Sequence, residues 1–202
     1  MSETRRFTRF RPGLSSESPV YSVVPDDGMC LSAFVVIRPA GSDPRVLLGR
    51  IDPQAAWLEK GGLDAARAAA VGDQWMLPSC QLLLFESPHE AAQRVVREQL
   101  EAGPIRLEGP SVFSEAYRRP GSPANDPHWD MHFVFQGRWP SDRPPRASMW
   151  RELAFVDVPS VRESELARLQ GDVLALIGLP PGRGDGNGGR DRPSARARTK
   201  RR

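Results

Sequence analysis

The segment from residue 86 to residue 104 constrains the fold more than any other part of this sequence. Ser87 is a natural helix N-cap, Pro88 suits the first helical position, and Glu90 stands three residues after Ser87, the spacing of a capping box. Apolar side chains then recur at helical spacing on one side, at Ala91, Ala92, Val96 and Leu100. Gly103 and Pro104 end the pattern. We therefore expect an amphipathic helix whose apolar side packs on another element.

Short runs rich in valine, isoleucine, leucine and phenylalanine provide that second element. They are bounded by turn-forming sequences such as "PDDG" and "PAGSDP", as β-strands usually are. The run 45–51 follows the run 30–39 after a turn and is expected to be its hairpin partner. The predicted strands cover residues 20–24, 30–39, 45–51, 105–117, 131–139 and 152–158.

Two further helices are predicted. A short one lies at residues 63–70, in an alanine-rich segment before the strand-like stretch 74–78. A longer amphipathic helix covers residues 160–179, where Ser160 and Glu163 have the spacing of a second capping box. Strands and helices mix without the regular alternation of a parallel sheet, so the predicted fold class is α+β with a mixed sheet.

Composition indicates a soluble globular protein. Of 202 residues, 39% are hydrophobic and 26% are charged, which is typical of globular domains. The sequence has no apolar run near the roughly 20 residues of a membrane helix, and its N-terminus does not resemble a secretory signal. We therefore expect a cytoplasmic protein. Cys30 and Cys80 are too few and too far apart for a disulfide framework or a cysteine-based metal site.

Charge divides the chain into three parts. Residues 1–18 are basic and are predicted to be disordered, residues 19–179 form the predicted domain, and residues 180–202 form a predicted disordered tail. The tail has eight basic and two acidic residues, a net +6, while the whole chain carries +3. The rest therefore carries −3. The tail favours salt-sensitive attraction to nucleic acid, or it is a solvated tail of an arginine-rich protein.

The helix that begins after Ser87 has a polar side with two interpretations. Val95, Glu98 and Gln99 share one face, where a Mg²⁺ ion would take carboxylates together with substrate phosphates, but Glu98 is the one carboxylate of the three. Arg94 lies four residues from both Glu90 and Glu98 and eight from Glu86, which suits an ion pair with one of these glutamates. The alternative is a surface helix whose charges form solvated salt bridges.

The same segment resembles the Nudix box, the signature of hydrolases that cleave nucleoside diphosphates linked to another moiety. Glu86, Arg94 and Glu98 match the first glutamate, the arginine and a later glutamate of that pattern, and "ESPHEAAQR" (86–94) matches a common extension of it. The strand-like segments on both sides are also similar, so that the resemblance covers roughly residues 20–178. It implies a Nudix-type α/β/α sandwich with a mixed sheet.

The resemblance also implies a site. Glu98, Glu86 and Arg94 would be the catalytic residues, with Mg²⁺ or Mn²⁺ as cofactor and a nucleotide or other phosphate-containing small molecule as ligand. Val95 and Gln99, however, replace two of the three usual metal-binding glutamates. Two lost charges opposite a divalent ion weaken binding by several kcal/mol, since a charge pair 4 Å apart contributes about 4 kcal/mol at an effective dielectric near 20. Family members form oligomers in some cases, so an oligomer is possible here.

Carboxylates outside the helix are candidate replacement ligands. They are Asp126, Asp130 and Glu152. Asp130 alternates with His128 and His132 in a strand-like stretch, so that these three side chains would share one face and form a second candidate metal site. The alternative for this stretch is a strand that leaves a polar loop and packs its other side chains in the core. The predicted metal ligands are Glu98, Asp130 and Glu152.

Trp57 and Trp129 are the predicted substrate-binding aromatics, because a tryptophan ring can stack on a nucleobase; core packing is the alternative for both. Three functional hypotheses follow. The chain is a catalytically weak or inactive Nudix-fold protein that still binds a ligand, an active divergent hydrolase with recruited metal ligands, or a nucleic-acid-associated protein that acts through its basic tail.

Overall fold

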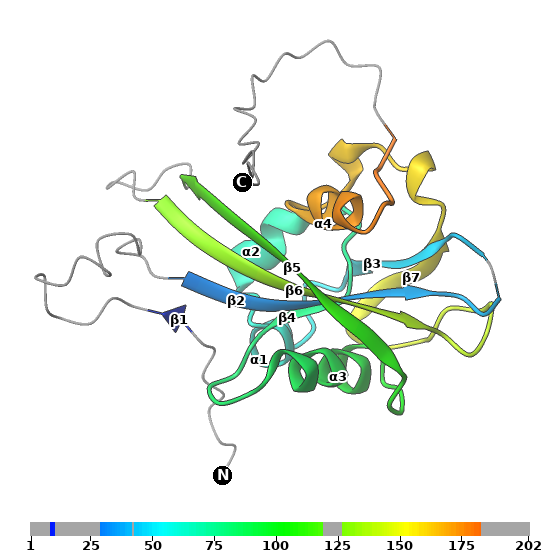
Figure 1. Cartoon of the computed structure of the whole chain (residues 1–202), viewed down its shortest axis with the longest axis horizontal. Coiled ribbons are helices and arrows are strands. Elements are labelled where there is room, and N and C mark those ends of the chain that lie inside the picture. Colours follow the sequence, from blue (N-terminus) through cyan, green and yellow to red (C-terminus); the bar gives the residue numbers. More distant parts are fainter. Residues whose placement is uncertain (1–8, 11–28, 42, 119–126, 183–202) are drawn as a thin grey trace, which may run out of the picture.

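The computed structural model of the chain describes residues 9–10, 29–41, 43–118 and 127–182 (Figure 1). The strand predicted at 20–24, most of both predicted disordered ends, and Asp126 lie outside the described residues. The division into a domain at 19–179 and two flanking tails therefore stays a prediction.

The larger of the two sheets is mixed, as the sequence predicts. At its centre β2 (Met29–Arg38) runs parallel to β6 (Pro127–Arg138), which pairs antiparallel with β5 (Leu107–Arg118). The short strands β1 (Arg9–Phe10) and β4 (Ser79–Gln81) both pair antiparallel with β2. The predicted α+β class with a mixed sheet is confirmed.

The second sheet corrects one strand pairing. The run 45–51 forms β3 (Val46–Ile51), but β3 pairs antiparallel with β7 (Trp150–Val156) and not with β2. Gly49 explains part of this choice, because a Cβ atom there would lie 2.1 Å from the Trp150 ring. The Trp150 ring thus packs directly on the Gly49 backbone, a contact that a hairpin between β3 and β2 would lose.

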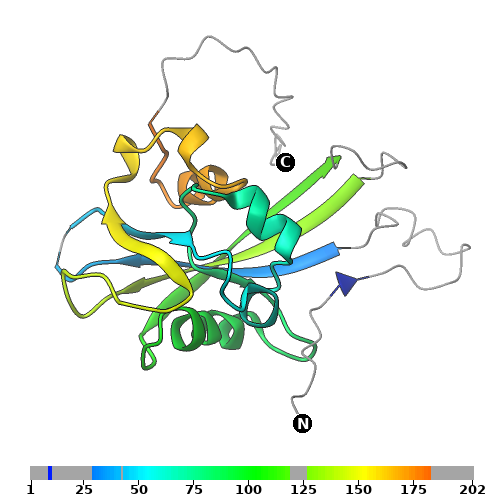
Figure 2. The ribbon, with the colours of Figure 1, turned by 180° about the vertical axis from the view of Figure 1, so that it is seen from behind.

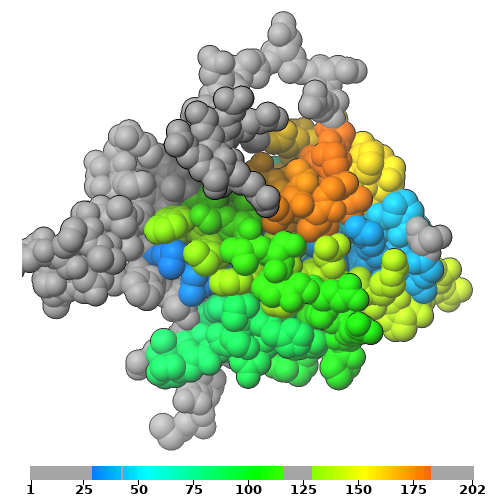
Figure 3. Space-filling view, viewed as in Figure 1, coloured from blue at the N-terminus to red at the C-terminus, as the bar shows by residue number. Residues whose placement is uncertain are grey.

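Helices cover both faces of the sheets, as Figures 1 and 2 show for α3 (Pro88–Gln99) on one face and α2 (Ala65–Val71) and α4 (Gln170–Leu176) on the other. Side chains of β2 alternate between these layers: Ala33, Val35 and Ile37 pack in the cluster that includes α3 residues, while Phe34 and Val36 pack in the cluster that includes α4 residues. The arrangement is an α/β/α sandwich. In Figure 3, β5 and α3 form one continuous surface below α4.

The short helices differ from the sequence expectations in part. The helix predicted at 63–70 is α2, and a further short helix, α1 (Trp57–Gly61), precedes it. The strand-like stretch 74–78 forms only isolated bridges, from Trp75 to Leu166 and from Met76 to Gly49.

The long helix predicted at 160–179 is wrong. That segment holds the 3-10 turns η2 (Val158–Ser160) and η3 (Glu163–Glu165), and α4 begins only at Gln170. The predicted capping box does not form, because the Ser160 hydroxyl donates to the Asp157 carbonyl. The bent path lets Val161 and Leu166 reach the core. None of the helices in the described ranges is long and apolar enough to cross a membrane.

Candidate functional site

The start of α3 confirms the predicted capping box. The Ser87 hydroxyl accepts a hydrogen bond from the Glu90 backbone N–H at 3.2 Å, and the Glu90 carboxylate accepts one from the Ser87 N–H at 2.8 Å. The helix ends earlier than Gly103 and Pro104 suggest, because Leu100 is its C-cap and Glu101 takes a left-handed φ of 51°. The cap fixes where α3 begins and therefore which side chains face the sheet.

Arg94 is buried in the middle of α3, with 3% of its side chain exposed, and forms a bidentate ion pair with Glu86. Its Nε donates to Glu86 Oε1 at 2.7 Å and its Nη2 to Oε2 at 2.8 Å. Burial opposes the Arg94 charge, but the hydrogen bonds that Arg94 donates to Glu86 and the nearby acidic groups outweigh burial and raise the pKa of Arg94. The predicted ion pair of Glu86 and Arg94 thus exists as a buried, charge-assisted contact.

Backbone carbonyls take the remaining donors of Arg94. Its Nη1 donates to the Lys60 carbonyl at 3.0 Å and its Nη2 to the Gln81 carbonyl at 2.8 Å. Glu86 Oε2 in turn accepts a hydrogen bond from the Leu83 N–H at 2.8 Å. The ion pair therefore ties the end of α1, the strand β4 and the loop 82–86 to α3.

The face of α3 that the resemblance assigns to a metal is mostly packed. Val95 is 1% exposed and lies in the hydrophobic cluster between α3 and the sheet. Gln99 is 0% exposed, and its Nε2 donates to the Ser79 carbonyl oxygen at 2.7 Å. Glu98 keeps 15% of its side chain exposed and lies 3.4 Å from the Arg97 guanidinium. Of these three positions, only Glu98 brings a carboxylate.

The contact between Gln99 and Ser79 has one possible polarity. If the Gln99 amide were turned round, its oxygen would face the Ser79 carbonyl oxygen, and two acceptors would repel each other. The Gln99 backbone carbonyl also accepts a hydrogen bond from Trp150 Nε1 at 2.8 Å. Gln99 Oε1 is buried and has no hydrogen-bond partner among the described residues. We call the Gln99–Ser79 hydrogen bond the α3 clasp.

These residues do not fit a divalent cation. Mg²⁺ prefers carboxylate and carbonyl oxygens, whereas Val95 has no donor atom and the Gln99 N–H occupies the Ser79 carbonyl. Within the described ranges, no group of three His, Cys, Asp or Glu side chains lies close enough together to hold a metal ion.

The predicted metal set of Glu98, Asp130 and Glu152 is therefore not assembled. Asp130 lies on β6 and lines a cavity on the side of the sheet opposite α3, because it shares the face of Val134 and not that of Phe135. Glu152 on β7 lies 3.6 Å from the Arg50 guanidinium. The sheet separates Asp130 from Glu98, which the linear sequence does not reveal.

The two tryptophans predicted to bind substrate differ in place. Trp57 is 2% exposed, its Nε1 donates to the Asp52 carbonyl at 2.9 Å, and its ring packs edge-on against Trp150. Trp57 is thus packed in the core, but it also lines the smaller cavity described below, so its role in binding stays a prediction. Trp129 is half-buried on β6, with its Nε1 3.0 Å from the Ser114 hydroxyl, so its role in binding stays a prediction.

A cavity of about 480 Å³ lies on the sheet face opposite α3. Its floor contains Ser32 of β2 with Asp130 and His132 of β6, and its walls contain Arg67 of α2 and the segment 167–170. A smaller cavity of about 130 Å³ shares Ser32 and Arg67 and extends it toward α1. We call the two together the sheet cavity.

The sequence pointed to Asp130 and His132 as candidate metal ligands, and it missed the walls of the sheet cavity. No sequence signal marks Arg67 or the segment 167–170 as part of a site, since both are brought there by tertiary packing. His128 belongs to β6, but its side chain lies outside the described ones.

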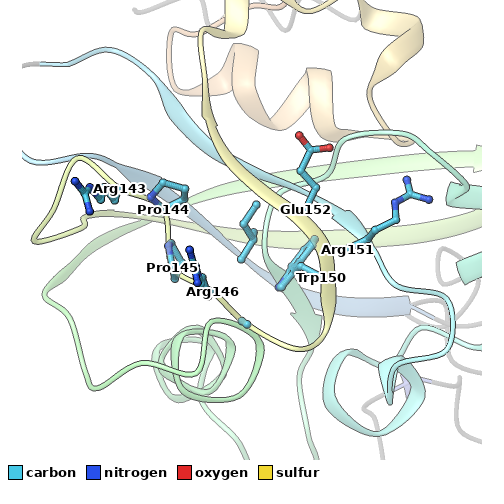
Figure 4. A pocket seen from close by; sticks show the side chains of 9 residues that line it. Arg143, Pro144, Pro145, Arg146, Trp150, Arg151 and Glu152 are labelled. Atoms are coloured by element: carbon cyan, nitrogen blue, oxygen red, sulfur yellow. The ribbon is translucent and has the colours of Figure 1, made fainter.

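A second hollow, of about 700 Å³, lies beside the start of β7 and is lined by residues that include Arg143, Arg146 and Arg151 (Figure 4). In Figure 4 the side chains of Arg143 and Arg151 extend toward opposite ends of the hollow. Arg151 moreover pairs with Asp73. The guanidinium groups do not converge on a common point, so this hollow offers no focused anion site.

No protein-family model matches the sequence, and no curated protein matches it either. Among solved structures the chain is similar to the Nudix domain of Shewanella oneidensis NrtR complexed with ADP ribose, at 14% identity and a TM-score of 0.49, over 74% of this chain and 86% of that one. It is also similar to a MutT Nudix hydrolase from Burkholderia pseudomallei, at 16% identity and a TM-score of 0.47, over 74% and 98%.

A third solved structure is the Ap4A hydrolase of C. elegans in a binary complex, at 13% identity and a TM-score of 0.45, over 74% of this chain and 95% of that one. The likeness is one of fold. The chemistry of the site is decided by the residues of this chain.

Proposed function

We propose that this chain is a Nudix-fold protein that binds a nucleotide or another phosphate-containing small molecule and hydrolyses it poorly or not at all. The α3 clasp carries the proposal. Gln99 places an N–H against the Ser79 carbonyl, at a point where a carboxylate would place a second acceptor.

A carboxylate beside a carbonyl oxygen is stable when a cation lies between them, because both groups are acceptors. In this chain an amide N–H takes the place of that cation. Val95 adds to the effect, since its buried methyl groups fill core volume where a glutamate would bring a charge. The α3 face is therefore closed by hydrogen bonding and packing without a metal.

The retained ion pair of Glu86 and Arg94 fits a scaffold role. Besides Glu86, Arg94 binds the backbone carbonyls of Lys60 in α1 and Gln81 in β4, two elements that also contribute to the sheet cavity. The pair holds the cavity in shape whether or not any hydrolysis occurs. This accounts for its presence in a chain that lacks the metal face.

The resemblance and the cavity support this class of ligand. Proteins similar in fold include one solved with ADP ribose and a dihydroneopterin triphosphate pyrophosphohydrolase of E. coli. Arg67 and Arg168 line the sheet cavity and supply positive charge for a phosphate. A free small molecule of this kind agrees with a cytoplasmic location.

One observation favours the second candidate, an active divergent hydrolase. Glu98 remains partly exposed on α3, where it can act on a water molecule or a cation. The third candidate, attraction of nucleic acid by the basic tail, falls on residues outside the described ones apart from 180–182. Removal of residues 180–202 followed by salt-dependent binding to DNA tests it.

A hydrolysis screen decides between the first two. Purified wild type is incubated with ADP-ribose, Ap4A and nucleoside triphosphates in the presence of Mg²⁺ or Mn²⁺, beside Glu98→Gln at equal concentration. We expect equal background rates in both proteins. Turnover by wild type that disappears in Glu98→Gln would refute the proposal and establish an active hydrolase.

A further inference from the structure

His132 is a buried histidine whose polar atoms are unused. It lies on β6 with 3% exposure, and neither Nδ1 nor Nε2 has a hydrogen-bond partner within the described part of the chain. Buried polar side-chain atoms in native proteins are hydrogen-bonded in the large majority of cases, so an exception calls for an explanation such as a catalytic role, a bound water or a ligand. The ring is held between Phe34, edge-on at 5.1 Å, and Phe113, stacked at 5.8 Å.

The His132 ring is neutral near pH 7. Burial lowers its pKa, Asp130 on the same strand acts in the opposite direction, and Arg168 adds to the lowering. A neutral imidazole has one N–H donor and one acceptor nitrogen. His132 lines the sheet cavity, and both of its nitrogens are buried beside that cavity without a hydrogen-bond partner among the described residues.

The side chains that line the walls of the sheet cavity are of two kinds. The apolar side chains of Leu63, Val71 and Met76 line the walls. Arg67 and Arg168 are more accessible, with 34% and 54% of their side chains exposed, and they also interact with Asp64 and Glu115. The cavity therefore combines a largely apolar lining with the Asp130 carboxylate on its floor and two more accessible cationic groups in its walls.

Backbone strain is a second sign of function at the same place. Leu169, which lines the cavity beside Arg168, has a φ of 69°, a left-handed conformation that a leucine rarely adopts. Such residues cost free energy and cluster at ligand-binding sites. The cavity volume of about 480 Å³ lies within the range of small-molecule sites.

We propose that His132 is the specificity-determining residue of the sheet cavity and hydrogen-bonds the edge of a heteroaromatic ring that belongs to an anionic ligand. A nucleotide has this chemistry, with its base inside the cavity and its phosphate toward Arg67 and Arg168. A sugar is a poorer occupant, because its hydroxyl groups would lose water against apolar walls, whereas a base has apolar faces and few polar edge atoms. The inference rests on the proposed function in that the chain binds a phosphate-containing ligand.

Calorimetric titration with AMP, GMP, CMP and UMP, and with ribose 5-phosphate as the probe that lacks a base, tests this assignment. We expect wild type to bind at least one nucleotide about tenfold or more tightly than ribose 5-phosphate. In His132→Phe, which keeps the ring shape, that preference falls about tenfold while the affinity for ribose 5-phosphate is unchanged. Arg67→Gln weakens the binding of all probes by a similar factor.

His89 provides the matched control. It is an exposed histidine on α3, away from the residues that line the sheet cavity, and His89→Gln should bind every probe as wild type does. A second measurement, made on the wild-type protein, tests the proposal even if His132→Phe does not fold. The ¹⁵N chemical shifts of the His132 ring should move with the preferred nucleotide and not with ribose 5-phosphate.

The outcomes separate the two proposals. Equal affinity of wild type for the nucleotides and for ribose 5-phosphate, with unmoved His132 shifts, would overturn the role of His132 and leave a phosphate-binding function in place. An absence of binding for every probe would overturn both.

Discussion

Arg94 and His132 are buried on opposite sides of the main sheet and differ in their hydrogen bonding. On the α3 side, Arg94 Nε, Nη1 and Nη2 each donate to an acceptor, and the Gln99 N–H donates to a carbonyl, although Gln99 Oε1 has no partner among the described residues. On the cavity side, His132 is as deeply buried as Arg94, and both of its nitrogens lack a partner among the described residues. Since an unsatisfied buried group destabilises the fold, the paired Arg94 stabilises the α3 side, whereas the nitrogens of His132 destabilise the fold unless a ligand pairs with them.

The largest expected effect on stability comes from removal of the buried Arg94 guanidinium. Arg94→Met removes the guanidinium donor from the carbonyls of Lys60 and Gln81 and from the buried Glu86 carboxylate, which keeps the Leu83 N–H. We expect the free energy of unfolding to fall by about 3–5 kcal/mol. Urea denaturation followed by tryptophan fluorescence measures the change.

Arg97 supplies the control, because it is an exposed arginine on the same helix that lies near Glu98. Arg97→Met should change the free energy of unfolding by no more than about 0.5 kcal/mol. Similar losses in both variants would contradict the structural role of the buried pair.

A smaller effect is expected at the α3 clasp. Gln99→Glu sets a buried carboxylate against the Ser79 carbonyl and should lower the free energy of unfolding by about 1–3 kcal/mol when no divalent cation is present. Added Mn²⁺ should restore part of the loss, because a cation can lie between the two oxygens. Thermal unfolding with and without Mn²⁺ measures both changes.

Gln99→Met removes the same hydrogen bond without adding a charge. It should lose stability without any response to Mn²⁺. A response to Mn²⁺ in Gln99→Met, or none in Gln99→Glu, would show that the clasp does not stand where a cation would bind.

Substitution of His132 should change the stability in the opposite sense. His132→Phe removes two unpartnered nitrogens from an environment that already contains Phe34 and Phe113, so we expect the free energy of unfolding to rise by about 1–2 kcal/mol while nucleotide binding weakens. Loss of stability in this variant would mean that His132 has a structural role.

The gain in the free energy of unfolding that we expect for His132→Phe should also depend on pH. Burial lowers the pKa of His132 below its ordinary value of 6.5, so the unfolded chain binds a proton at a higher pH than the folded chain does. Wild type therefore loses stability as the pH falls from 6.5 through the folded pKa, and the variant lacks this loss. The difference between the two should be larger at pH 5 than at pH 8, as measured by denaturant unfolding at both values.

The smallest effect is expected at the start of α3. Ser87→Ala removes the acceptor of the Glu90 backbone N–H and should lower the free energy of unfolding by about 1 kcal/mol. Ser87→Gly should lose only a few tenths of that, since glycine tolerates the cap position. Equal losses in the two variants would argue against a hydrogen-bonded cap.

The sequence predicted those features that depend on local spacing. The capping box at Ser87, the strand β2 and the placing of Asp130 and His132 on one face of β6 all follow from periods of two or of about four residues. The pairing of β3 with β7 was missed, because strand pairing depends on distant partners and here on the contact of Gly49 with Trp150.

The site was harder to predict for a further reason. The α3 clasp uses a backbone carbonyl, that of Ser79, and any residue type supplies one. The role of Gln99 as donor was therefore invisible in a comparison of side-chain types, which showed only a lost carboxylate. Segment 167–170 was predicted as helix, and its wall of the sheet cavity exists because the chain bends at Leu169 instead.

Binding of Mn²⁺ to the wild-type protein, followed through the electron paramagnetic resonance signal of free Mn²⁺, tests the central claim most directly. The measurement uses Glu98→Gln and the double variant Val95→Glu/Gln99→Glu alongside. We expect wild type to bind Mn²⁺ no better than Glu98→Gln does, and the double variant to bind it measurably, because two carboxylates then join Glu98 on the α3 face. Tight Mn²⁺ binding by wild type that is lost in Glu98→Gln would contradict the claim that hydrogen bonding and packing close the α3 face without a metal ion.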